Sequence, residues 1–111
     1  MRGRVAVIHK RDTTPAGFTR IYIGRPSALG NPFTHLGRAT LAAHQVGTRE
    51  EAVLAYRSWA TEERERADSP FAHAFAALEA KLAAGENLAL ECWCAPLACH
   101  GDVLAELLLA G

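Results

Sequence analysis

Short apolar runs with strand-like spacing occur at three places in the chain: residues 4–9, 19–24 and 88–94. In the first run, two valines alternate with Ala6 and Ile8, so both faces of the strand are apolar. This pattern predicts a strand that is buried on both sides. The second run has isoleucines on either side of Tyr22, which is typical of a strand.

Three longer stretches have apolar residues three and four apart, which predicts amphipathic helices. They are residues 48–66, 69–85 and 102–109. Thr48 and Glu51 form a capping box at the start of the first helix. Ser69 followed by Pro70 begins the second helix, and Gly85 ends it. The residues expected to face the core are Ala52, Val53, Tyr56, Trp59, Ala60, Phe71, Phe75, Leu78, Leu82, Leu104, Leu107 and Leu108.

The order of these elements, β-β-α-α-β-α, predicts a small single-domain α/β sandwich spanning residues 1–111. About three strands, partly parallel, would pack with three main helices. The two helices between the second and third strands are long enough for a crossover that sets those strands parallel. A long irregular segment, residues 25–47, separates the second strand from the first helix, and residues 41–45 are expected to form a short helical turn within it.

The composition and charge of the chain narrow the classes of partner and the cellular locations that we expect. Twelve Lys and Arg balance twelve Asp and Glu, so no broad basic surface for nucleic acid is expected, although a local basic patch remains possible. No apolar run approaches the roughly 20 residues of a membrane helix, and the apolar stretch at the start is too short for a signal peptide. Three cysteines are an odd number for a disulfide framework, so we expect a cytoplasmic protein.

All three cysteines and one histidine fall within nine residues: Cys92, Cys94, Cys99 and His100. Thiolate and imidazole are preferred ligands of zinc, so these four residues are candidate metal ligands. Cys92 and Cys94 share one face of the third strand, and we expect Trp93, on the other face, to pack in the core. Cys99 and His100 lie where the last helix begins.

Two other interpretations of the cluster stay open. In the first, it is a metal-free thiol site: the helix dipole would favour the thiolate of Cys99, with His100 and Asp102 as acid–base partners. In the second, the cysteines are small buried residues that fill the core. Cys99, His100 and Asp102 are therefore the candidate catalytic residues.

The second strand is followed by a loop rich in glycine and proline, whose candidate ligand-binding residues are Gly24, Arg25, Pro26, Ser27, Gly30 and Asn31. Glycine lets the backbone approach a ligand, and arginine binds phosphate or carboxylate through parallel donors. The alternative is structural: Arg25 would cap a carbonyl or pair with a carboxylate, and Asn31-Pro32 would be a turn.

If the second and third strands are parallel, this loop and the start of the last helix lie at the same edge of the sheet, where α/β proteins bind ligands. An anionic ligand would then lie between Arg25 and the N–H groups of that helix. His35 and His44, in the irregular segment, are within possible reach of the site, whereas His73 is expected on the surface.

Three segments together resemble the bacterial and phage family called domain of unknown function 4326. They read YIGRPS with LGNPF, GTREEAV with YR, and CWCAP with CHGDVL. The resemblance spans most of the chain and implies a compact single-domain protein. It implies no activity, and it supports treating the loop and the cysteine cluster as one site.

The leading hypothesis is a composite site for a small anionic ligand: a nucleotide, a nucleoside or a nucleic-acid end. Zinc would assist hydrolysis or transfer at a base or glycosidic bond, with Asp102 as general base. One alternative is a non-catalytic binding module stapled by a structural zinc. The other is a thiol enzyme without metal. Whether the protein is an enzyme stays open.

Overall fold

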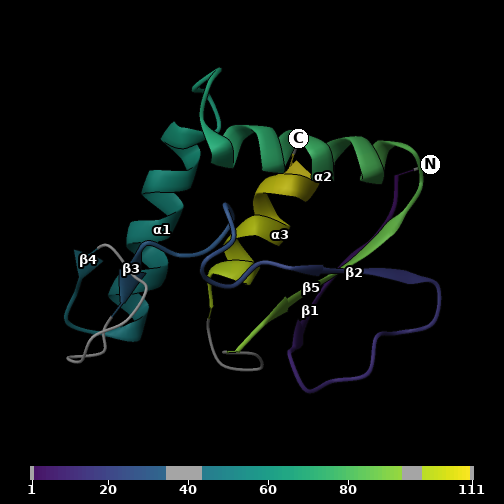
Figure 1. Ribbon diagram of the computed structural model, residues 1–111, viewed down its shortest axis with the longest axis horizontal. Coiled ribbons are helices and arrows are strands. Elements are labelled where there is room, and N and C mark those ends of the chain that lie inside the picture. Colours follow the sequence, from purple (N-terminus) through teal and green to yellow (C-terminus); the bar gives the residue numbers. More distant parts are fainter. Residues whose placement is uncertain (1, 35–43, 94–98, 111) are drawn as a thin grey trace.

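β5 (Asn87–Cys92) is the central strand of a three-stranded sheet, between β1 (Val5–His9) and β2 (Phe18–Tyr22). The computed structural model describes residues 2–34, 44–93 and 99–110 (Figure 1). Both pairings are parallel, with Val7 and Ile21 each opposite Leu90. The predicted α/β class and the order β-β-α-α-β-α are therefore confirmed, and this sheet is parallel throughout.

Among the described residues, three helices complete the fold: α1 (Arg49–Glu63), α2 (Pro70–Ala83) and α3 (His100–Ala110). The side chain of Thr48 accepts a hydrogen bond from the backbone of Glu51 at 3.0 Å, and Ser69 caps α2 in the same way. These caps satisfy backbone donors that the first helical turn leaves without partners. The predicted starts of α1 and α2 are confirmed, and α3 begins two residues before its predicted start.

The core lies on one side of the sheet, where Leu88, Leu90 and Cys92 of β5 meet the helices. Their side chains are at most 1% exposed, because successive residues of a strand alternate between the two faces. α2 and α3 pack on β5, and α1 packs on α3 (Figure 1). The phenylalanines and leucines predicted for the inner face of α2 are all buried.

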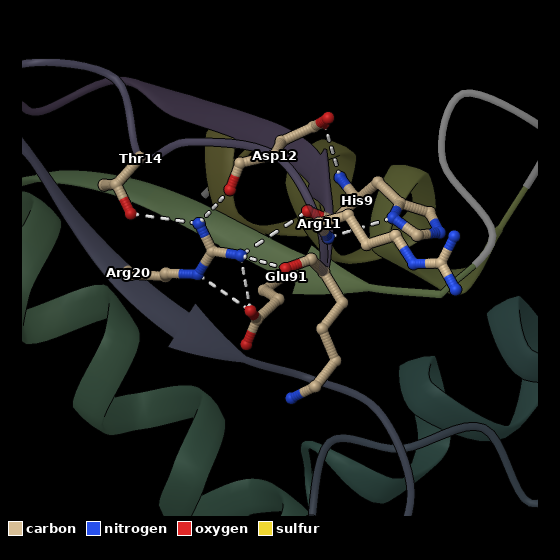
Figure 2. A network of polar contacts seen from close by, with 7 residues as sticks. His9, Arg11, Asp12, Thr14, Arg20 and Glu91 are labelled. Atoms are coloured by element: carbon tan, nitrogen blue, oxygen red, sulfur yellow. Dashed lines mark hydrogen bonds and ion pairs between the residues drawn. The ribbon is translucent and has the colours of Figure 1, made fainter.

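The opposite face of the sheet is organised by Arg20, which lies opposite Ala89 in the pairing of β2 with β5. Its guanidinium forms an ion pair with the buried carboxylate of Glu91 at 2.6 Å (Figure 2). It also donates to the backbone carbonyls of Lys10 at 2.7 Å and Asp12 at 2.6 Å. Because β1 and β2 are parallel, residues 10–17 must lead the chain back along the sheet. Arg20 fixes that return connection to the strands.

Several details differ from the sequence predictions. Trp93 is 55% exposed, so its predicted place in the core is wrong. It does face away from Cys92, but that side of the sheet carries no helix to cover it. His44–Gln45 is a short strand, β4, which pairs with β3 (Phe33–Thr34), so the helical turn predicted over residues 41–45 is wrong at these two positions; residues 41–43 lie outside those described. Ile8 is the one buried residue of β1, because β1 lies at the edge of the sheet.

None of the helices within the described ranges has the length and apolar character needed to cross a membrane.

Replacing Arg20 with Ala is expected to lower the free energy of unfolding by about 3 kcal/mol, because Glu91 is left as a buried charge without its partner. Urea denaturation at neutral pH measures the change. The control is Arg57→Ala, which removes an exposed ion pair with Glu106 and should cost about 0.5 kcal/mol or less. Equal losses in the two variants would contradict a stabilising role for the Arg20 network.

Candidate functional site

The carboxyl ends of the three main strands meet at one edge of the sheet, and α3 begins there. The ring nitrogen Nε2 of His100, the first residue of α3, lies 2.7 Å from the backbone oxygen of Ile23. This contact joins the end of β2 to the start of α3. The expected convergence of the glycine–proline loop with the start of the last helix is therefore present in the structure.

Cys99 occupies the position just before α3 and caps the helix with its sulfur. The backbone N–H of Gly101 donates to Cys99 Sγ at 3.1 Å. In return, the carboxylate of Asp102 accepts a hydrogen bond from the backbone N–H of Cys99 at 3.2 Å. This resembles a capping box, with a thiol in place of the usual hydroxyl and with the N–H of the second helical residue, Gly101, in place of the third. Asp102 therefore contributes to the start of the helix, whatever its chemical role.

Gly101 allows α3 to start directly against the sheet. A Cβ atom at this position would lie 2.9 Å from a methyl carbon of Val7 and 3.0 Å from Cδ1 of Ile23. Both distances are shorter than ordinary packing permits, so any larger residue would push the helix start away from the strands. The spacing of the cysteines gave no indication of this constraint.

The sulfur atoms of Cys92 and Cys99 lie 3.1 Å apart, and both side chains are buried. The strand end and the helix start thus bring two of the predicted metal ligands together. Cys94, the third thiol, lies outside the described residues. Within the described ranges, no group of three or more His, Cys, Asp and Glu side chains has the arrangement of a metal site.

His100 is buried, and burial lowers its pKa below the ordinary value of 6.5; the nearby Arg25 guanidinium lowers the pKa further. The Ile23 carbonyl and Asp102 act in the opposite direction but do not reverse the shift. The ring is therefore neutral at pH 7. Because a carbonyl only accepts hydrogen bonds, Nε2 carries the proton, and Nδ1 presents its lone pair. That lone pair is suited to bind a metal or to take up a proton.

Tyr56 of α1 belongs to the site, although the sequence indicated only a core residue. Its ring meets the His100 ring edge-on at 5.0 Å, and its hydroxyl donates to the Leu29 carbonyl at 2.7 Å. Burial, with a further contribution from Cys99, raises its pKa far above 10.0, so the hydroxyl stays protonated. The sequence did contain a signal for this role. A tyrosine within an apolar stripe is expected to be buried, and a buried phenol hydroxyl needs a hydrogen-bond partner.

Backbone and side-chain bonds hold the glycine–proline loop in one conformation. Tyr22 donates its hydroxyl hydrogen to the Arg25 carbonyl at 2.8 Å, and a Cβ at Gly24 would collide with that tyrosine. The backbone N–H of Gly30 donates to the Ser27 carbonyl at 2.9 Å. The Arg25–Pro26 peptide bond is cis. The loop therefore has a defined conformation at the sheet edge, although it contains no regular helix or strand.

Asn31 ties this loop to α1. Its side-chain nitrogen donates to the Ala52 carbonyl at 3.2 Å, and its side-chain oxygen accepts from the Phe33 N–H at 2.9 Å. The residue is 8% exposed. Its amide is therefore used at both ends within the protein, which gives it a structural position; its binding role stays a prediction.

Two polar atoms of the glycine–proline loop differ from its other polar groups in their hydrogen bonding. Nη1 of Arg25 and Oγ of Ser27 are buried, and neither has a hydrogen-bond partner among the residues that the structure describes. Buried polar groups of this kind are uncommon in proteins and are often found where a ligand or an ordered water binds. Arg25 lies close enough to His100 to influence its pKa, so these atoms belong to the same edge as the start of α3.

The remaining histidines are distributed around the molecule. His9 ends β1, and its ring meets Trp93 edge-on at 5.9 Å. His73 is exposed on α2, as predicted. His44 begins β4, and His35 lies outside the described residues.

The fold and site define a small parallel α/β protein with buried thiols, an imidazole and an arginine at one sheet edge. The chain belongs to the family described as a domain of unknown function (DUF4326), whose model matches residues 7–110. No curated protein and no solved structure matches the chain. The resemblance seen in the three sequence segments is therefore confirmed at the level of the family.

The lowered pKa of His100 predicts a pH-dependent stability. Burial disfavours the charged ring only in the folded state, so the unfolded chain binds this proton more readily. The stability contribution is present above the unfolded value of about 6.5 and is lost as the pH falls from there through the folded pKa. Urea midpoints at about pH 7.5 and about pH 5.5, with EDTA present, should show a smaller acid loss in His100→Gln than in the unmodified protein.

His73→Gln is the matched control for that measurement, because His73 is an exposed histidine on α2. It should keep the pH dependence of the unmodified protein. The same acid loss in His100→Gln as in the unmodified protein would show that His100 does not carry the effect.

Proposed function

We propose that the protein binds a small anionic ligand of the nucleotide class, through its phosphate group, at the carboxyl edge of the sheet. The observation that carries the proposal is the pair of buried atoms, Arg25 Nη1 and Ser27 Oγ, for which the described part of the chain supplies no partner. A guanidinium and a hydroxyl match the acceptor oxygens of a phosphate. A bound phosphate would satisfy both groups.

The start of α3 supports an anion at this edge. The N–H groups in the first turn of a helix carry partial positive charge. Cys99 Sγ already accepts from one of them, Gly101 N, which places an electron-rich atom where an anion is favoured. His100, neutral through its lowered pKa, adds no positive charge, so Arg25 is the principal cation in this part of the site.

We also propose zinc as the cofactor. The two sulfur atoms at 3.1 Å can face one cation, and the donor set of thiols with a neutral imidazole is one that zinc favours. His100 donates Nε2–H to a backbone carbonyl, which is the usual outer contact of a zinc-binding histidine. Cys92 and Cys99 would hold the metal, with Nδ1 of His100 and Cys94 as further candidates; since the described residues alone do not form a metal site, the proposal depends on Cys94. Zinc at this position would supply a Lewis acid beside the phosphate site.

As an enzyme, the protein would catalyse hydrolysis or transfer at a base or glycosidic bond, with Asp102 as general base. Asp102 is exposed, and the contact that fixes its position is its hydrogen bond to Cys99 N. The thiol alternative requires access to Cys99, which is only 2% exposed. A cytoplasmic location, where thiols stay reduced, and a bacterial or phage origin remain part of the proposal.

Replacing both Arg25 and Ser27 with Ala is expected to weaken the binding of inorganic phosphate and of adenosine monophosphate by about tenfold or more, the range of a lost charged hydrogen bond. Isothermal titration calorimetry measures both affinities. Arg4→Ala is the matched control, because it removes an exposed arginine just before β1, at the opposite edge of the sheet. Equal affinities in the two variants would contradict the phosphate site.

Untagged protein purified without chelator is expected to contain about one zinc per chain, measured by elemental mass spectrometry. The Cys94→Ser, Cys99→Ser variant should lose it, whereas His73→Gln should keep it. Chelation would unfold the protein if the zinc is structural, but would leave the melting curve nearly unchanged if it is catalytic. Protein without metal in every preparation would contradict the zinc proposal.

A further inference from the structure

Trp93 is the most exposed aromatic side chain in the described part of the chain, and its position is fixed by neighbouring residues. It is 55% exposed directly after β5. The His9 ring meets it edge-on at 5.9 Å, and the Lys10 ammonium lies 5.5 Å from its ring centre. The indole is therefore held by two neighbours and remains accessible for stacking.

Lys10 lies between two aromatic rings. Its ammonium is 4.6 Å from the centre of the Tyr22 ring, and its backbone N–H donates to the Cys92 carbonyl at 2.7 Å. That backbone bond continues the pairing of β1 with β5 by one residue and places Lys10 beside Trp93. Lys10 forms no ion pair with any residue that the structure describes. We call Lys10, Tyr22 and Trp93 the aromatic–lysine cluster.

This cluster adjoins the proposed phosphate site. The hydroxyl of Tyr22 donates to the backbone carbonyl of Arg25, so one tyrosine contacts both groups of residues. Trp93 directly follows Cys92, whose sulfur meets Cys99 at the start of α3. The cluster lies on the face of the sheet away from the helices, whereas α3 packs on the opposite face; Tyr22 joins the cluster to the loop through the Arg25 carbonyl.

We propose that Trp93 is a stacking platform for the base of a nucleotide whose phosphate is bound at Arg25 and Ser27. This inference rests on the proposed phosphate site and adds a base subsite to it. Indole rings stack on nucleobases whichever base is present, and a nearby ammonium attracts the phosphate of the same nucleotide. Aromatic rings beside a lysine that has no ion-pair partner among the described residues therefore suit a nucleotide better than an uncharged or cationic partner. Two sources share this chemistry: a free nucleotide and the end of a single strand.

The test uses tryptophan fluorescence. The chain has two tryptophans, and Trp59 packs with Tyr56 and Phe71. A Trp59→Phe variant keeps an aromatic ring there and leaves Trp93 as the sole reporter. The probes are adenosine monophosphate, a short 5′-phosphorylated single-stranded oligonucleotide and inorganic phosphate. We expect the two probes with bases to quench Trp93, and inorganic phosphate to leave its emission unchanged.

Affinity measurements by calorimetry complete the test. Trp93→Leu should weaken binding of the better base-containing probe roughly tenfold, which is within the range for loss of base stacking, and leave phosphate affinity unchanged. Thermal melting checks that this exposed substitution leaves the fold intact. Stronger binding of the monophosphate identifies a free nucleotide as the ligand, and stronger binding of the oligonucleotide identifies a strand end.

The two proposals fail in different ways. Phosphate binding that depends on Arg25, together with unchanged nucleotide affinity in Trp93→Leu, overturns the base subsite and leaves the phosphate site intact. Quenching and a Trp93-dependent affinity that persist in the Arg25→Ala, Ser27→Ala variant overturn the phosphate site and support stacking on Trp93. An absence of quenching by both base-containing probes overturns the base subsite.

Discussion

The parallel pairing of β5 with both of its neighbours is the constraint on which the rest of the molecule depends. It directs three strand ends to one edge, so that the loop after β2, the thiol that ends β5 and the first turn of α3 occupy the same region. It also imposes a requirement, because β1 and β2 run in the same direction and the short connection between them must return along the sheet. Arg20 meets that requirement by binding the connection and the buried carboxylate of Glu91 together. The site and the Arg20 network are therefore two consequences of one topology.

The two faces of the sheet have different characters, and the site lies where they meet. Leu88, Leu90 and Cys92 form a dry face under the helices. The other face carries an ion pair, a lysine between aromatic rings and an exposed indole. The ligand proposed for the carboxyl edge would therefore lie where an apolar face and a face with cationic and aromatic groups meet. This combination suits a molecule with a charged end and a flat aromatic end.

Much of the fold could be predicted from the sequence, because apolar spacing and helix caps are local signals. Thr48, Ser69 and the apolar stripe of α2 are examples that the structure confirms. Trp93 was misplaced because alternation along a strand shows which face a residue occupies but not whether that face is covered. Tyr56, Gly101 and the Ile23 carbonyl contribute to the site through contacts between elements distant in the chain, which local patterns do not reveal. Arg25 was proposed as a binding residue from the chemistry of its side chain, and the burial of its Nη1 is seen only in the structure.

The sulfur of Cys99 combines two roles that different atoms usually have: it caps a helix, and it is a candidate metal ligand or nucleophile. As the acceptor for the N–H of Gly101, it holds the first turn of α3 in place, and it is also the atom that a metal or an electrophile would reach. Any event at this sulfur must therefore change the hydrogen bond that begins the helix. Amide hydrogen exchange at Gly101 would therefore report a change in the chemical state of the thiol.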